Sequence, residues 1–292
     1  MDYDAKYNEY KGYFNGELEK FCENKLDCRP QILSDSLKYS LMLGGKRIRP
    51  VLMLAVGEIL GKKKEELINF AIALELIHTY SLIHDDLPAM DNDDFRRGKP
   101  SNHKAFGEDN AILAGDGLLN TAYSLLFDEC FKSSEHISAA KCICECAGIF
   151  GMIAGQSADL LNENGKANSE EELKFIYEHK TGKLILAPVI VPSILSSGRY
   201  FPELKSFALD LGTLFQLTDD ILDVEGEFEN LGKTVGKDEK EGKLTAVSLL
   251  GLDRAKLGVD IIADRCLTSL EGLDGDTSFL KELVNRMRTR IN

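Results

Sequence analysis

The stretch of sequence that decides the fold runs from Leu76 to Asp91 and reads LIHTYSLIHDDLPAMD. An apolar, helix-like run leads directly into adjacent aspartates, and Pro88 then breaks the helix. Adjacent carboxylates repel each other, and an apolar neighbourhood makes their charge more costly unless cations compensate for it. The pattern therefore predicts a long helix that ends at a cation-binding cluster of aspartates.

A second cluster, Asp219-Asp220-Ile-Leu-Asp223, ends another apolar run further along the chain. Asp219 and Asp223 are four residues apart, so they lie on one face of a helix. Magnesium is a hard ion that prefers oxygen ligands, and it is usually held by one or two carboxylates while substrate phosphates complete its shell. The two clusters together predict a split magnesium site for a phosphorylated substrate.

The remainder of the chain predicts helices throughout. Only 7 of the 292 residues are Pro, 43% are hydrophobic, and apolar residues recur at helical rather than alternating spacing. No change of composition divides the chain into halves, so we expect one all-α domain over residues 1–292. Helices are expected near residues 1–27, 30–43, 48–61, 64–86, 108–131, 136–162, 169–196, 202–226, 243–251, 252–270 and 275–290.

The overall charge is acidic, with a formal net charge of -13 and a pI of about 5.0. Such a balance excludes nucleic acid as a partner, because binding to nucleic acid requires a basic face. Two basic clusters, Lys46-Arg47-Ile-Arg49 and Arg96-Arg97, stand out against this background. We interpret them as anion pockets.

The N-terminal residues predict a cytoplasmic location. The sequence MDYDAKY has neither the basic segment nor the apolar segment of a secretory signal. No uninterrupted apolar stretch approaches the ~18 to 20 residues that span a bilayer. We therefore expect a cytoplasmic protein with no membrane span, whose seven cysteines are reduced thiols.

Six motifs in a fixed order carry a family resemblance. They are Gly44-Gly45-Lys46-Arg47-Ile-Arg49-Pro50, His78 ahead of Asp85-Asp86 and Asp91, Arg96-Arg97-Gly98, Lys180-Thr181-Gly182, Gln216-x-x-Asp219-Asp220-x-x-Asp223 and Gly232-Lys233-Thr234. From about residue 30 to the C-terminus the chain resembles the short-chain trans-prenyl diphosphate synthases, and within them the bacterial-type farnesyl diphosphate synthases. The resemblance implies the isoprenoid synthase fold, which is a single large bundle of roughly ten or more helices around a central cavity. It also implies a homodimer.

In that family, two aspartate-rich motifs bind three magnesium ions that hold an allylic diphosphate. A leaving diphosphate gains negative charge, which metals and fixed cations stabilise. Manganese is a possible substitute for magnesium. By resemblance, the metal ligands are Asp85, Asp86, Asp91 and Asp219, with Asp223 acting directly or through water. The same resemblance places Arg96, Lys180 and Lys233 on the diphosphate.

The second substrate, isopentenyl diphosphate, keeps its diphosphate and therefore needs a site without metal. The family positions for that site match Lys46, Arg49, His78 and Arg97. The resemblance further implies that the carbonyl of Lys180, the hydroxyl of Thr181 and the amide of Gln216 face the developing carbocation. Oxygen dipoles suit such a cation because a strong nucleophile would trap it. The released diphosphate is expected to take the proton.

The length of the product is expected to depend on the residues one helical turn before the first motif. Tyr80 and Ser81 lie five and four positions before Asp85. In the family, an aromatic residue at the fifth position accompanies farnesyl producers. We therefore expect a magnesium-dependent prenyltransferase that condenses isopentenyl diphosphate with dimethylallyl and then geranyl diphosphate to give farnesyl diphosphate.

Three alternatives differ from this interpretation. A geranyl or geranylgeranyl diphosphate synthase would use the same mechanism with another tunnel floor. A terpene cyclase would normally carry a different second cluster and would not need Lys46, Arg49 and His78. A non-catalytic partner subunit would typically have lost one aspartate cluster, whereas both are intact here.

Overall fold

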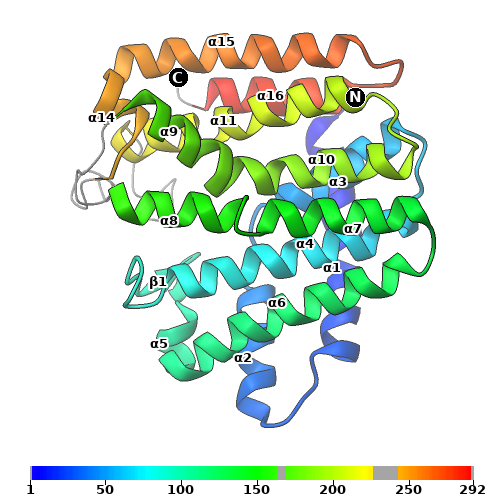
Figure 1. Cartoon of the computed structure of the whole chain (residues 1–292), viewed down its shortest axis with the longest axis vertical. Coiled ribbons are helices and arrows are strands. Elements are labelled where there is room, and N and C mark those ends of the chain that lie inside the picture. The colour runs from blue at the N-terminus through cyan, green and yellow to red at the C-terminus, as the bar shows by residue number, and fades with distance from the viewer. Residues whose placement is uncertain (1, 163–168, 226–242, 291–292) are drawn as a thin grey trace. The chain divides into compact units, whose positions relative to one another are not determined.

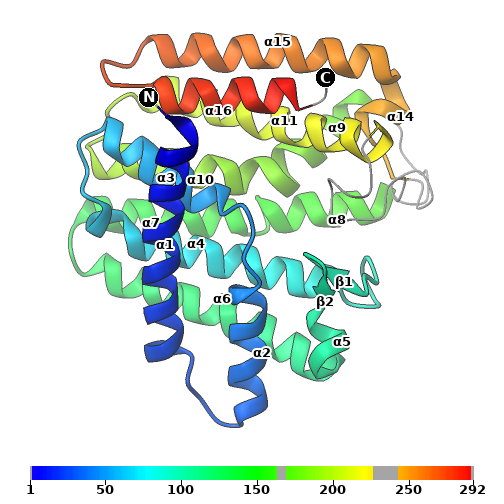
Figure 2. The ribbon, with the colours of Figure 1, turned by 180° about the vertical axis from the view of Figure 1, so that it is seen from behind.

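The computed structural model describes residues 2–162, 169–225 and 243–290 (Figures 1 and 2). Almost every element is a helix, and the described residues hold more than ten of them, so the all-α prediction is confirmed. The chain divides into two compact units, which are described separately. The N-terminal unit comprises residues 2–58 and 62–140, and the C-terminal unit comprises residues 59–61 and 141–292.

The elements follow the order of the chain. Those that begin in the N-terminal unit are α1 Tyr3–Lys25, α2 Gln31–Met42, α3 Ile48–Ile59, α4 Lys64–Asp85, β1 Phe95–Arg96, β2 Lys99–Pro100, α5 Asn102–Phe106, α6 Glu108–Cys130 and α7 Ser134–Ala147. Those of the C-terminal unit are α8 Met152–Asn162, α9 Glu170–Ile176, the π-helix η1 Tyr177–Gly182, α10 Lys183–Leu195, α11 Phe201–Glu225, α14 Ala246–Leu250, α15 Leu252–Glu271 and α16 Ser278–Thr289.

The core of the N-terminal unit is the pair α4 and α6. Helix α4 is apolar around most of its circumference, and such a helix is stable only when it is buried on all sides. Helix α6 approaches it through the small buried residues Ala111, Ala114 and Gly115. A side chain at position 115 would collide with the imidazole of His84 on α4. Close packing of these two helices fixes the end of α4, where the first aspartate cluster begins.

In the C-terminal unit, α11 is the central helix. It packs against α10, α15 and α16, and the views in Figures 1 and 2 agree on this arrangement. Helices α9, η1 and α10 follow one another without a break, so the single helix expected over residues 169–196 is continuous but contains a π-helical turn. Two glycines allow neighbouring helices to pack closely against this turn. A β-carbon at Gly155 would collide with the backbone of Lys180, and one at Gly212 would collide with the backbone of Gly182.

The single helix expected over residues 136–162 is wrong, because the structure divides it into α7 and α8. The break lies at residues 148–151, where the backbone N–H of Gly151 donates to the carbonyl of Gly148 at 2.9 Å. A side chain at position 151 would collide with the carbonyl of Cys146, so only glycine permits this tight path. Helical spacing of apolar residues on both sides of the break concealed it.

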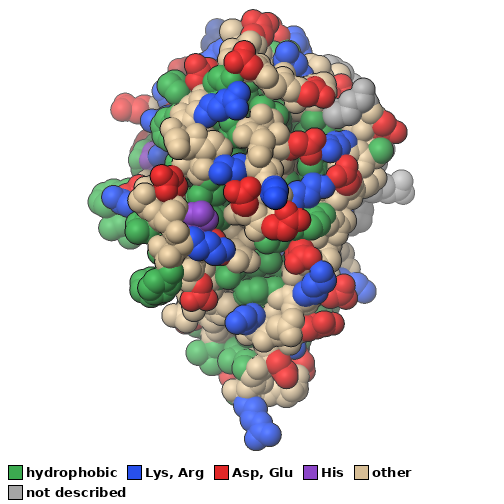
Figure 3. Space-filling view, turned by 90° about the vertical axis from the view of Figure 1, so that its right-hand side faces the viewer, with side chains coloured by type: hydrophobic (Ala, Val, Ile, Leu, Met, Phe, Trp, Pro, Cys, Tyr) green, Lys and Arg blue, Asp and Glu red, His purple; other side chains and the backbone are tan. Residues whose placement is uncertain are grey.

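Two stretches of the described residues are long and apolar enough to cross a membrane by length and composition alone. They are Lys64–Asp85 and Ser134–Asn162, and 72% and 39% of their most apolar windows are buried. The first is the core helix α4, and core helices of soluble proteins pass the same test. On the face drawn in Figure 3, acidic and basic side chains are interspersed rather than gathered in a patch of one sign.

Candidate active site

The first aspartate cluster forms a compact turn at the end of α4. The backbone N–H of Asp91 donates to the carbonyl of Asp85 at 2.9 Å, and that of Asp93 donates to the carbonyl of Asp86 at 3.2 Å. These bonds fold the chain back after the helix stops, as the proline in this segment predicts. The turn therefore brings together the three aspartates of the first motif.

The two adjacent aspartates of this motif have different surroundings. Asp85 is half-buried, whereas Asp86 is only 2% exposed. The Nε of Arg96 donates to both carboxylate oxygens of Asp86, at 3.0 and 3.2 Å, and a terminal nitrogen of the same guanidinium adds a third bond. Burial raises the pKa of Asp86, and the charge of Arg96 opposes that rise. Asp86 and Arg96 thus form a partly buried ion pair with several hydrogen bonds.

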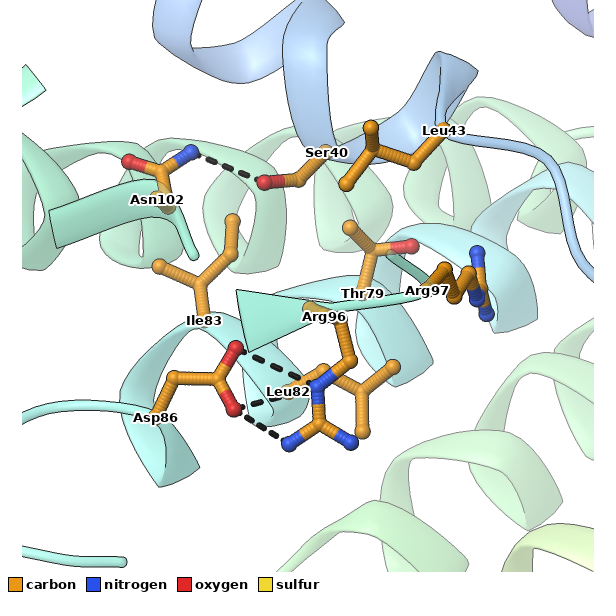
Figure 4. A pocket seen from close by; sticks show the side chains of 9 residues that line it. All are labelled: Ser40, Leu43, Thr79, Leu82, Ile83, Asp86, Arg96, Arg97 and Asn102. Carbon is orange, nitrogen blue, oxygen red and sulfur yellow. Dashed lines mark hydrogen bonds and ion pairs between the residues drawn. The ribbon is translucent and has the colours of Figure 1, made fainter. Parts of the chain in front are cut away.

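A small pocket lies beside this pair in the N-terminal unit. Figure 4 shows Arg96 turned toward Asp86 and Arg97 turned away from it, although the two arginines are adjacent in the chain. The pocket is lined by Ser40, Leu43, Thr79, Leu82, Ile83, Asp86, Arg96, Arg97 and Asn102. The two adjacent arginines therefore point in different directions.

Backbone geometry explains how Arg97 is directed. Strands β1 and β2 pair in antiparallel register, and the two-residue turn between them has positive φ at Arg97 (55°) and Gly98 (75°), as in a type I′ hairpin. The guanidinium of Arg97 donates to the carbonyl of Gly44. A β-carbon at position 45 would lie 2.6 Å from its Cζ, so glycine there leaves room for the arginine. Sequence reasoning did not predict this hairpin, because its strands are too short to show alternation.

Arg47 has a structural role that the sequence did not reveal. Its NH1 lies 2.6 Å from the Oε1 of Glu75 on α4, and both side chains are 2% exposed. Its Nε also donates to the side chain of Asn15 at 3.2 Å, and the hydroxyl of Tyr7 donates to the carbonyl of Lys46 at 2.5 Å. Arg47 therefore anchors the basic loop to α1 and α4, whereas the neighbouring Lys46 remains exposed.

Three residues predicted for the metal-free diphosphate site influence one another electrostatically. Burial lowers the pKa of Arg49 to about 10, with Glu75 opposing the change and the charge of Arg97 adding to it. Burial also lowers the pKa of His78 well below its ordinary 6.5, and the charges of Arg49 and Arg97 lower it further. The buried Nε of Arg49 has no hydrogen-bond partner among the described residues. Such a group of mutually repelling donors suits a polyanion.

The residues predicted to control product length lie on α4. Tyr80 is 7% exposed, and its ring packs edge-to-face on His84 with 5.8 Å between the ring centroids. Burial raises the pKa of Tyr80 to about 12. Ser81 is half-buried, and its hydroxyl donates to the carbonyl of His78 at 2.8 Å. Tyr80 is thus a large, buried side chain, whereas the hydroxyl of Ser81 forms a hydrogen bond within its own helix.

The second aspartate cluster lies within α11. Asp219 and Asp223 are half-buried, whereas Asp220 is 2% exposed. The Oδ1 of Asp219 lies 3.8 Å from the guanidinium of Arg290, which follows α16. The helical spacing of four therefore places the carboxylates of Asp219 and Asp223 on one face of α11, as predicted.

The π-helix presents the Lys-Thr-Gly motif next to α11. The hydroxyl of Thr181 donates to the Oε1 of Gln216 at 2.8 Å, so the two residues expected to face the carbocation are neighbours. The ammonium of Lys180 is paired with the buried Asp159 on α8. The remaining predicted residue, Lys233, lies outside the described residues.

The donor set fits magnesium that is shared with a substrate. Within the described part of the chain, no three His, Cys, Asp or Glu side chains form a ready-made metal cage. Magnesium at phosphate sites is typically bound by one or two carboxylates plus phosphate oxygens, rather than by a cage made of protein alone. In the N-terminal unit, Asp85 and Asp91 supply hard oxygen donors of this kind, and in the C-terminal unit Asp219 and Asp223 do so.

Comparisons with known proteins agree with this chemistry. A model of the family "Polyprenyl synthetase" matches residues 30–268. A farnesyl diphosphate synthase of Geobacillus stearothermophilus is 43% identical over 97% of this chain and 96% of its own length. A chloroplastic geranylgeranyl pyrophosphate synthase of Capsicum annuum is 44% identical over 84% of this chain and 68% of its own length. The structure of a geranyltransferase from Helicobacter pylori, complexed with magnesium and isoprenyl diphosphate, superposes with a TM-score of 0.82 at 34% identity, covering 98% of this chain and 97% of that one.

Proposed function

Because the chain belongs to the polyprenyl synthetase family, we propose that it condenses isopentenyl diphosphate with dimethylallyl and then geranyl diphosphate to give farnesyl diphosphate. One observation carries this proposal beyond family membership. In the N-terminal unit, two sets of side chains of different chemistry support it: the cations Arg49 and Arg97 beside the neutral His78, and the carboxylates of Asp85 and Asp91. A prenyltransferase needs both, because one diphosphate must stay and the other must leave.

The cationic group would hold isopentenyl diphosphate. Arg49 and Arg97 offer planar guanidinium donors, His78 adds a ring N–H, and the exposed Lys46 adds a mobile point charge. Arg47 holds the loop that carries Lys46 and leads into α3, where Arg49 lies. These residues bind the substrate's diphosphate without promoting its departure, because no carboxylate among them recruits a metal.

The two aspartate motifs would hold magnesium on the allylic diphosphate. Bound magnesium supplies charge neutralisation for the leaving diphosphate. The proposed ligands are Asp85, Asp86, Asp91, Asp219 and Asp223, for three ions, and manganese is a possible substitute. Arg96, Lys180 and Lys233 would add fixed positive charge on the same group. The contacts of Asp86 give it the further task of holding Arg96 in place.

The developing cation would face oxygen dipoles. Thr181 and Gln216 are already hydrogen-bonded to each other, so little reorganisation is needed when charge appears. The carbonyl of Lys180 adds a third dipole. Released diphosphate takes the proton that the coupled product loses, and no side chain serves as the general base.

Tyr80 supports a C15 product. It is buried and bulky at the fifth position before the first motif, where it would block further growth of the chain. Geranylgeranyl or geranyl synthesis is the alternative, and the 44% identity to the Capsicum annuum geranylgeranyl enzyme favours giving it a test.

We further propose a cytoplasmic homodimer in which residues 1–292 act as one catalytic domain. Helix α6 and its C-terminal cap support a dimer, because Tyr123, Phe127 and the cap residue Phe131 recur at a spacing of four and are 36%, 65% and 78% exposed. The rings of Phe127 and Phe131 also pack edge-to-face, 5.4 Å apart. An apolar stripe of this kind suits a self-complementary contact with a second copy. Sedimentation velocity of wild type and of a Phe127→Lys variant would test it.

The decisive experiment incubates purified protein with labelled isopentenyl diphosphate and dimethylallyl diphosphate, with and without magnesium, and identifies the prenyl alcohols after dephosphorylation. Magnesium-dependent farnesol is the expected result. Geraniol or geranylgeraniol would keep the reaction and overturn the assignment of Tyr80. No elongation would overturn the proposal in favour of a cyclase or a silent subunit.

A further inference from the structure

Asp220 differs from the other aspartates of its motif. It is 2% exposed, and its Oδ2 accepts from the backbone N–H of Ala246 at 2.8 Å and from the hydroxyl of Tyr177. Its Oδ1 accepts from the Nε2 of Gln216 at 3.0 Å. All of these donors are neutral and belong to the C-terminal unit. The carboxylate is therefore engaged by the protein's own groups.

These contacts form a chain with a fixed direction. A carboxylate can only accept hydrogen bonds, so the amide nitrogen of Gln216 must be the atom that faces Asp220. The amide oxygen of Gln216 then faces Thr181, and the hydroxyl of Thr181 must donate to it. One buried charge thus decides which end of each neutral dipole points which way.

We infer that Asp220 is a positioning residue, which directs the hydroxyl hydrogen of Thr181 toward Gln216 so that the Thr181 oxygen is presented to the carbocation. The inference rests on the proposed function, which places Thr181 and Gln216 beside that cation. An oxygen whose hydrogen is engaged elsewhere offers lone pairs, whereas a hydroxyl of reversed direction would offer its positive end.

The backbone supports this direction. Tyr177 begins the π-helix and Thr181 lies within it, while Gln216 and Asp220 lie one turn apart on α11. Two bonds therefore join the π-helix to α11, one at Asp220 and one at Gln216. Ala246 brings the first turn of α14 to the same carboxylate and also donates to the Tyr177 hydroxyl at 2.9 Å.

The test is Asp220→Asn, which keeps the shape but allows the chain of hydrogen bonds to reverse. The asparagine oxygen can still accept from Ala246 and Tyr177, and its amide can donate to Gln216, which then turns and donates to Thr181. We expect kcat to fall by about tenfold to a hundredfold, while the KM for both substrates and the magnesium dependence change by less than about twofold. Unchanged kcat in a folded variant would overturn the inference.

A double-mutant cycle separates an effect on the direction of the Thr181 hydroxyl from a general loss of rigidity around Asp220. Thr181→Val removes the hydroxyl, so Asp220→Asn should have little further effect on kcat in that background. Tyr177→Phe is the matched control, because it removes a bond to the same carboxylate but leaves the direction of the chain intact, and kcat should stay near that of wild type. Independent, multiplicative effects of Asp220→Asn and Thr181→Val would overturn the inference.

Two further results complete the design. If Asp220→Asn does not fold, Gln216→Leu cuts the same chain nearer to Thr181. The direct effect of losing the Gln216 amide remains in the Thr181→Val background, but the part that passes through Thr181 is lost there, so the total effect on kcat should be several-fold smaller. Equal effects in the two backgrounds would overturn the inference. If wild-type protein makes no prenyl product, the proposed function fails and the inference fails with it, whereas an active wild type with an unaffected Asp220→Asn variant contradicts the inference alone.

Discussion

The two aspartate motifs hold their inner carboxylates in contrasting ways. Asp86 and Asp220 are each 2% exposed, and each directly follows a half-buried aspartate. Asp86 is paired with the charged guanidinium of Arg96, whereas Asp220 accepts hydrogen bonds from the backbone of Ala246, the amide of Gln216 and the hydroxyl of Tyr177. In each motif we call the more accessible first aspartate (Asp85 or Asp219) the outer carboxylate, and the second (Asp86 or Asp220), which is held by contacts within the protein, the inner carboxylate.

The contrast extends to the surroundings of each motif. Near the first, stability depends on buried charges, including the pair of Arg47 and Glu75. Near the second, Asp220 is held by neutral dipoles whose directions agree, and the ion pair of Lys180 with the buried Asp159 lies on the neighbouring elements. Removing one partner of a buried charged pair costs much folding free energy, because the other charge is left unpaired. A network of neutral hydrogen bonds costs less to disturb, because its members can form new bonds. Substitutions should therefore affect the two regions differently.

The largest effect should come from the outer carboxylates. Asp85→Ala and Asp219→Ala should each lower kcat on the order of a thousandfold, because each removes oxygen donors for magnesium. Thermal unfolding should change little, since both side chains are half-buried. Asp94→Ala is the control, because that exposed residue pairs with Lys104 at 2.8 Å, and its activity should match wild type. Near-normal turnover of either variant with magnesium would contradict the ligand assignment.

Substitutions of the two inner carboxylates, Asp86 and Asp220, should lower the stability of the protein by different amounts. Asp86→Asn removes the main anion of the partly buried Arg96, which keeps only the more distant Asp93 at 3.8 Å, and should lower the free energy of unfolding by about 2 kcal/mol. Asp220→Asn should lower it by about 1 kcal/mol, because an amide can still bond to neutral partners. Urea unfolding followed by circular dichroism measures both. Equal losses would show that the contrast between charged and neutral partners does not govern stability.

The buried group around His78, Arg49 and Arg97 should also make the stability of the protein sensitive to acid. The pKa of His78 is well below 6.5 in the folded protein, so below pH 6.5 the unfolded chain binds a proton that the folded chain does not. Stability should therefore fall as the pH drops below 6.5, by up to about 1.4 kcal/mol per pH unit from this group. His78→Gln should make the decline shallower, and Tyr177→Phe should not. Unfolding free energies at pH 7 and 5.5 give the comparison, and an identical slope in His78→Gln would count against it.

The smallest effect on rate should come from Tyr80, which acts by bulk rather than charge. Tyr80→Ala should shift the product from C15 toward longer chains while kcat for the first condensation changes by less than about threefold. Chromatography of the dephosphorylated alcohols would show the shift. Ser81→Ala offers a comparison on the same turn, since the hydroxyl it removes bonds within α4. Unchanged C15 output from Tyr80→Ala would place the tunnel floor elsewhere.

Long periodic segments were the most predictable part of the fold. The helix expected over residues 64–86 is α4, and the one expected over 108–131 is α6, each within a residue of its observed end. Apolar spacing and the proline after the first motif were sufficient there. The sequence did not predict the π-turn, the break at residues 148–151 or the hairpin, because each of them depends on backbone contacts rather than on the periodicity of apolar residues.

At the site, the types of residue were predictable but their directions were not. Arg47 lies between two residues expected to bind diphosphate, yet it turns inward to Glu75. Arg96 and Arg97 diverge because the turn between β1 and β2 gives Arg97 a positive φ. Asp219 and Asp220 differ only in the side of α11 that they occupy. Such distinctions arise from tertiary packing, which no local pattern records.

The π-turn at Tyr177–Gly182 has a consequence for insertions and deletions. A π-turn holds one residue more than an α-helical turn, so every side chain after it is rotated by about 100° relative to a regular helix. Deleting a single residue from this segment would give α9 and α10 a more regular hydrogen-bond ladder and, at the same time, turn Thr181 away from Gln216. Selection for catalysis would therefore preserve a length here that selection for helix stability alone would shorten.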